Sequence, residues 1–143
     1  MSALMDQAVN CFLQTNAALL PRDKIAHLSS GVSTLAQAIE VSTRSPAGAD
    51  DLLPAIIYLL IYTNPPLLVS NLNLIRRLSP PELLRRGEQA YHYCSICSGA
   101  HLFVFLTVGC TFNLILSDNY IYSVVNSIRI YACFMIHSHS VEL

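Results

Sequence analysis

The sequence predicts an all-α fold, and three features of its 143 residues indicate it. Only five glycines are present. Most of the seven prolines fall where a helix would begin or end. Apolar side chains recur at steps of three and four residues in separate stretches, which is the period of an amphipathic helix. A chain of this length suits one domain, so we expect helical layers around a central buried helix at about residues 52–63.

The first two predicted helices are amphipathic. Residues 3–15 carry a short apolar stripe at helical spacing. Pro21 opens the second helix, because proline is tolerated in the first turn. Residues 25–39 then present a single apolar face, in which Gly31 costs roughly 1 kcal/mol relative to alanine. Residues 42–48 are a loop by composition.

The predicted central helix has an acidic start. Asp50 and Asp51 precede an apolar run that ends at the Asn-Pro-Pro of residues 64–66. This run is shorter than the roughly 20 residues that span a membrane, so we expect a core helix. Either aspartate can cap it by accepting backbone N–H bonds, and the other stays ionised at the positive end of the helix dipole. Pro54 sits in or just after the first turn, where its missing N–H costs little.

The next elements are shorter. Residues 67–78 form a helix with one apolar side, and a brief helical piece at residues 82–86 ends at Gly87. The last predicted helix begins at Glu88 and runs through Ala100, with small residues on one side that suit close packing.

From Phe103 onward the helical register is lost, and the chain is apolar with few charges. Residues 99–116 have about the minimum length for a membrane span. A transmembrane helix is therefore the alternative interpretation of this region, against a tail that does not span.

Composition excludes one class of function and indicates a compartment. The net charge is -1, and no basic cluster exceeds the pairs Arg76-Arg77 and Arg85-Arg86, so we expect no nucleic-acid partner. These pairs either form a solvated helix face or face anionic lipid or an acidic partner. An odd number of cysteines, five, and the lack of a basic-then-apolar N-terminal signal indicate a reducing, cytosolic setting.

Cys94 and Cys97, with His92 and His101 nearby, have half of the spacing of a structural zinc site. Packing of these side chains is the simpler explanation, and we expect neither a metal nor a cofactor. A second loose cluster lies in the tail: Cys133, His137 and His139.

Separated blocks of residues 4–103 resemble, in order and spacing, the catalytic domain of the vacuolar-protein-sorting-nine (VPS-nine) family. The blocks are Pro21-Arg22-Asp23-Lys24-Ile25, Ala49-Asp50-Asp51-Leu52-Leu53-Pro54, Asn64-Pro65-Pro66, Ser70-Asn71 and Gly87-Glu88-Gln89-Ala90-Tyr91.

The resemblance implies a guanine-nucleotide exchange module for early-endosomal Rab GTPases of the Rab-five group. In that family the aspartate at Asp50 enters the nucleotide site, which leaves Asp51 for capping. The tyrosine at Tyr91 contacts a switch region, and the proline at Pro54 shapes the groove. An inserted carboxylate can compete for the lysine that holds the phosphates and disturb the Mg²⁺ shell.

The resemblance extends the predicted GTPase-binding set to Asn71 and Cys94. At Cys94 the family usually has a hydroxyl residue, which hydrogen-bonds more strongly than a thiol. We expect a regulatory exchange factor rather than an enzyme with covalent chemistry, located in the cytoplasm and peripheral to early endosomes.

The family domain has further helices upstream, so we expect residues 1–103 to be a partial domain and residues 104–143 a divergent hydrophobic tail, foreign to the fold. The alternative is a truncated, inactive or binding-only isoform that associates with membranes through this tail.

Overall fold

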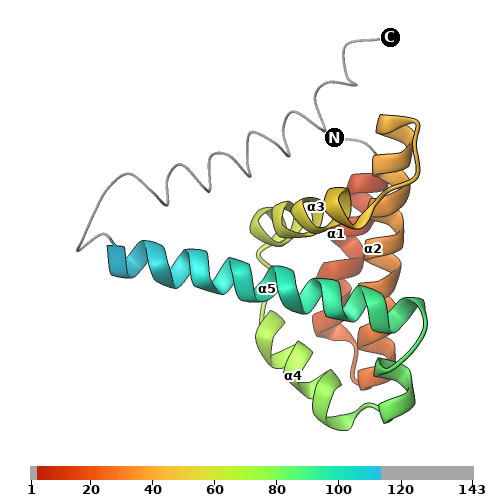
Figure 1. Ribbon diagram of the computed structural model, residues 1–143. Coiled ribbons are helices and arrows are strands. Elements are labelled where there is room, and N and C mark those ends of the chain that lie inside the picture. The colour runs from red at the N-terminus through yellow and green to blue at the C-terminus, as the bar shows by residue number, and fades with distance from the viewer. Residues whose placement is uncertain (1–2, 114–143) are drawn as a thin grey trace.

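The structure is a computed structural model that describes residues 3–113, and over that range the predicted all-α class is confirmed. Five α-helices and one 3-10 helix follow one another without a strand (Figure 1). In chain order they are α1 (Ala3–Ala17), α2 (Pro21–Thr43), α3 (Ala49–Thr63), α4 (Leu68–Leu78), η1 (Pro81–Leu84) and α5 (Glu88–Asn113).

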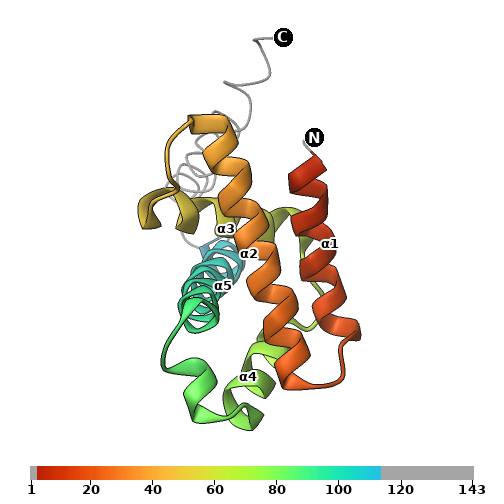
Figure 2. The same cartoon turned by 90° about the vertical axis from the view of Figure 1, so that its right-hand side faces the viewer.

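Helix α2 contacts each of the other four α-helices. Its antiparallel neighbour α1 lies along one side, α3 and α5 pack together against it, and α4 lies near its N-terminal end (Figures 1 and 2). The described core combines side chains of all five helices, including Phe12, Leu28, Leu59, Ile75 and Ile96, each almost fully buried. Burial of this apolar surface is the main stabilising term of the fold.

The close approach of α1 and α2 requires Gly31. A Cβ atom there would lie 2.7 Å from Cδ2 and Cε2 of the buried Phe12 ring. Gly31 lowers the helix propensity of α2, but its missing side chain is what lets the ring of α1 sit against the α2 backbone.

Helix α3 is buried on one side and open at its C-terminal end. Leu52, Ile56 and Leu60 are buried, whereas Ile61 is 39% and Tyr62 51% exposed. The ring of Tyr62 stacks on that of Tyr58, with centroids 6.1 Å apart. The apolar run predicted as a core helix thus has one face in the core and one face outside it.

Two helix ends differ from the sequence prediction for local reasons. Helix α2 continues to Thr43, where the hydroxyls of Ser42 and Thr43 donate to the carbonyls of Ala38 and Ile39. Arg44 then ends it in the left-handed conformation, with φ of 55°. Local hydroxyl bonds of this kind let polar residues extend a helix that composition alone assigns to a loop.

Helix α5 continues to Asn113, past the predicted loss of register at Phe103. Within residues 3–113, no helix combines the length and the hydropathy that a membrane span requires. Most of the predicted tail lies outside the described residues, as does the end of the alternative span at residue 116.

Candidate functional site

The two aspartates of α3 lie inside its first turn, and Gly48, not an aspartate, is the N-cap residue. The prediction that one of the aspartates caps the helix by accepting a backbone N–H bond is confirmed for Asp51, because its Oδ2 atom accepts a hydrogen bond from the Gly48 N–H at 3.3 Å. This is the reciprocal half of a capping box, in which the third helical residue reaches back to the cap.

Asp50 is left free by this arrangement. Its side chain is exposed and makes no hydrogen bond or ion pair within the described part of the chain. A carboxylate in the first turn of a helix interacts favourably with the helix dipole. The structure therefore presents one uncommitted negative charge at this end of α3.

Pro54 lies in the second turn of α3, just after the first turn, because the helix begins at Ala49. In an α-helix the N–H of residue 54 would bond to the carbonyl of residue 50. Proline has no such donor, so the backbone carbonyl of Asp50 loses its regular intrahelical partner. Pro54 thus alters the backbone of the residue that carries the free carboxylate.

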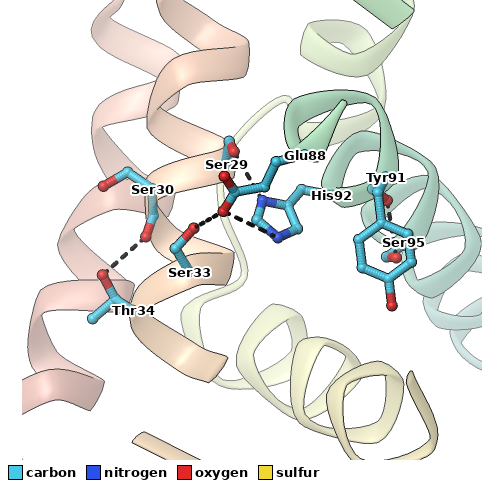
Figure 3. A network of polar contacts seen from close by, with 8 residues as sticks. All are labelled: Ser29, Ser30, Ser33, Thr34, Glu88, Tyr91, His92 and Ser95. Carbon is cyan, nitrogen blue, oxygen red and sulfur yellow. Dashed lines mark hydrogen bonds and ion pairs between the residues drawn. The ribbon is translucent and has the colours of Figure 1, made fainter. Parts of the chain in front are cut away.

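Helix α5 presents Tyr91 and Cys94 one turn apart on the same exposed side. The Tyr91 side chain is 48% exposed. Its ring lies beside that of His92, with centroids 5.8 Å apart and planes tilted by 54°. In Figure 3 the Tyr91 ring lies on the far side of His92 from α2.

A polar network ties the start of α5 to α2 (Figure 3). The Nδ1 atom of the buried His92 lies 2.8 Å from Ser29 Oγ. Its Nε2 atom lies 3.9 Å from Glu88 Oε1, which also accepts a hydrogen bond from the Ser33 hydroxyl at 3.0 Å. These contacts fix the turn of α5 on which Tyr91 stands.

Burial lowers the pKa of His92, and the nearby Glu88 carboxylate and the contact with Ser29 oppose that shift only in part. The neutral imidazole is therefore the favoured form in the fold. Sequence reasoning did not single out this network. The only trace of it in the sequence is two polar pairs at helical spacing, Ser29 with Ser33 and Glu88 with His92.

Helices α3 and α5 meet closely at Gly99. A Cβ atom at Gly99 would lie 3.2 Å from Ile56 Cγ2 and 3.5 Å from Leu60 Cδ1. Asp50 and Tyr91 both lie N-terminal to this contact, one on each helix. The small residues predicted to allow close packing of the last helix do so here.

Asn71 is placed differently from the other predicted site residues, because it is buried in the fold. Its Oδ1 atom accepts a hydrogen bond from Lys24 Nζ at 2.8 Å, and its Nδ2 group donates to Asn16 Oδ1 at 3.3 Å. Lys24 also donates to the carbonyl of Thr15 at 3.0 Å. Asn71 therefore joins α4 to α1 and α2 from within.

The two cysteines of α5 differ in exposure, because Cys97 is half-buried and Cys94 is exposed. The Tyr93 hydroxyl donates to the Leu72 carbonyl at 3.0 Å, and burial raises the pKa of Cys97. In the described range no three His, Cys, Asp or Glu side chains are arranged to hold a metal ion. The cluster Cys133, His137 and His139 lies outside the described residues.

Residues 5–105 match the Vacuolar sorting protein 9 (VPS9) domain family. The chain is 33% identical to the Rab5 GDP/GTP exchange factor of Homo sapiens over 96 residues. These residues are 67% of this chain and 20% of that protein. The mouse protein of the same name gives the same identity and coverage.

A plant relative is also similar. The Vacuolar protein sorting-associated protein 9A of Oryza sativa subsp. japonica is 39% identical over 82 residues, which is 54% of this chain and 17% of that protein. The chain thus spans about a fifth of the length of the curated relatives that it matches.

Proposed function

Because the chain belongs to the VPS9 domain family, we propose that it is a guanine-nucleotide exchange module acting on a Rab GTPase of the Rab5 group. The proposal rests on one observation, that the two aspartates at the start of α3 have different surroundings. Asp51 is bound to the cap residue, and Asp50 is exposed and uncommitted.

In this proposal the Asp50 carboxylate enters the nucleotide site of the GTPase. A small GTPase holds its nucleotide through Mg²⁺ and a lysine on the phosphates. A carboxylate brought there attracts the lysine, repels the phosphates and disturbs the octahedral shell of the metal. GDP release is then accelerated without any covalent step, so the module is a regulatory factor.

The contact surface for the GTPase consists of Asp50 and Pro54 on α3 with Tyr91 and Cys94 on α5. The exposed Tyr91 ring offers a large, rigid and amphipathic contact, which suits a protein interface. Behind this surface, the His92 network holds α5 to α2 and the Gly99 contact holds α5 to α3. Asn71 serves this surface by support from inside and not by direct contact.

We place the activity in the cytoplasm, at the surface of early endosomes, as an extension of the exchange proposal. The domain division stays a proposal as well: residues 1–103 as a partial exchange domain and residues 104–143 as a tail foreign to it. No cofactor is required, because the bound nucleotide and Mg²⁺ belong to the GTPase.

The direct test mixes the full chain with a Rab5-group GTPase that carries fluorescent GDP, and follows GDP release. We expect acceleration, its loss in Asp50→Ala, and its reduction in Tyr91→Ala. Asp6→Ala is the matched control, because it removes an exposed carboxylate from the first turn of α1. Unchanged acceleration in Asp50→Ala would refute the proposed mechanism.

The same experiment separates the binding-only alternative. Cys94 stands where the family usually has a hydroxyl residue, which weakens one expected hydrogen bond. If the chain binds the GTPase but does not speed GDP release at high concentration, it is a binding-only form. Cys94→Thr is then expected to raise the affinity.

A further inference from the structure

One end of the described fold carries most of the exposed positive charge of residues 3–113. Two chain connections lie there, the turn from α1 to α2 and the segment from α4 through η1 (Figures 1 and 2). We call this the basic end. It carries five exposed arginines: Arg22, Arg76, Arg77, Arg85 and Arg86.

These arginines are not neutralised within the fold. In the described residues none of them forms an ion pair with a carboxylate. Arg76 donates to the Asn73 side chain at 3.2 Å, which leaves its charge uncompensated. The acids of the same segments are Asp23 and Glu82, both exposed, so positive charge prevails at this end.

Large apolar side chains are exposed among these charges. Leu19 is 89%, Leu20 61% and Leu78 67% exposed. Each lies in or beside one of the two connections that carry the arginines. Single exposed leucines are common on proteins, but three beside uncompensated arginines combine the two signals that surface membrane binding needs.

We propose that the basic end is a contact surface for a bilayer that contains anionic lipids. The arginines would face the head groups, and the leucines would insert at the boundary with the acyl chains. A bilayer is favoured over an acidic protein, because the charges come from two separate connections at one end. The hollow found there in the described residues is lined by a single arginine, Arg86, together with the carboxylates of Glu82 and Glu88, so it does not favour an acidic chain. This inference does not depend on the exchange activity.

The basic end lies away from the surface that carries Asp50, so binding to a bilayer would not cover that surface. The N-terminal turn of α3 with Asp50 lies toward the opposite end of α2 (Figure 1). A bilayer at the basic end would therefore leave the Asp50 surface open to solution. Val41, near the C-terminal end of α2, and Arg44, the residue that follows the helix, are exposed and lie far from the basic end. They therefore offer matched controls.

The charge test measures partition of the full chain onto phosphatidylserine-containing vesicles and onto neutral phosphatidylcholine vesicles. We expect binding to the anionic vesicles alone, weakened by salt. Arg85→Gln with Arg86→Gln should lower the partition coefficient by roughly tenfold or more. Arg85→Gln alone should lower it more than Arg44→Gln, which removes the same charge elsewhere.

The apolar test uses Leu19→Ser and Leu78→Ser, with Val41→Ser as the control at a site whose exposed fraction lies between those of the two leucines. We expect weaker partition for the first two only. All variants should keep their thermal midpoints and, without vesicles, their rate of GDP release. Equal binding to neutral vesicles, or full binding by the Arg85→Gln, Arg86→Gln variant, would overturn the proposal, because another segment would then hold the membrane.

Discussion

Lys24 of α2 and Asn71 of α4 are joined by a buried hydrogen bond of 2.8 Å between Nζ and Oδ1. Both side chains are less than a tenth exposed, and no carboxylate of the described residues neutralises the lysine. The two residues belong to two of the sequence blocks that indicated the family. The blocks therefore occur together for a structural reason, since each supplies one half of a contact inside the fold.

Loss of the Lys24 ammonium should destabilise the domain strongly. Lys24→Met keeps most of the apolar stem but leaves the Asn71 Oδ1 atom and the Thr15 carbonyl without their donor. We expect a loss of about 2–3 kcal/mol in the free energy of unfolding, measured by urea denaturation. The variant Lys24→Met, Asn71→Leu should lose less than the sum of the two single variants, because no buried acceptor of Asn71 then remains unpaired.

Substitution of Asp50 should mainly affect exchange activity, whereas substitution of Asp51 should mainly affect stability. Asp51→Ala removes the bond to the Gly48 N–H and should cost about 1 kcal/mol of unfolding free energy. Asp50→Ala removes only the interaction with the helix dipole, about 0.5 kcal/mol, yet should abolish exchange. Thermal midpoints and GDP-release rates of both variants check this, and equal loss of exchange in both would contradict it.

Gly31→Ala should destabilise the protein even though alanine favours a helix. The gain in propensity is about 1 kcal/mol, whereas the new methyl would meet the buried Phe12 ring at 2.7 Å. Overpacking of this kind costs typically 1–3 kcal/mol, so we expect a net loss of about 1 kcal/mol. Smaller damage in Gly31→Ala, Phe12→Leu than in the single glycine variant would identify the ring as the cause. Gln37→Ala, on the exposed side of α2, is the control.

Stability should fall in mild acid through His92. Burial lowers the pKa of its imidazole below 6.5, so the unfolded chain binds the proton more readily than the fold does. This contribution to stability is complete above pH 6.5 and decreases as the pH falls below that value. Urea midpoints between about pH 8 and about pH 5 should decline less in His92→Gln than in the parent protein. An identical decline in both would exclude His92 as the source.

Local sequence rules predicted the type and order of the helices. The segments of α1, α2 and α4 have an apolar stripe of period three to four, α3 has a continuous apolar run, and a proline or glycine lies near an end of each helix after α1. These rules left open which aspartate caps α3, and the resemblance to the family assigned capping to Asp51. The exact ends were harder. The start of α3 depends on Gly48, whose backbone N–H reaches Asp51, and composition gives no sign of that bond.

The polar contacts behind the site could not be predicted. Ser29 and His92 are 63 positions apart, and Lys24 and Asn71 are 47 apart. Such pairs are specified only when the helices are placed in space. The burial of Asn71, which places it behind the predicted contact surface, likewise depends on how α4 packs against α1 and α2.

Pro54 has a mechanical consequence for the residue that carries the free carboxylate. Because proline has no N–H, the Asp50 carbonyl lacks its regular donor. One backbone hydrogen bond between the first turn of α3 and the rest of the helix is therefore missing. The residues before Leu52 can then open locally without breaking the core contacts that begin at Leu52 and Ile56. Amide hydrogens at the start of α3 should exchange with solvent through small local openings, while those of residues 57–60 exchange only when the domain unfolds.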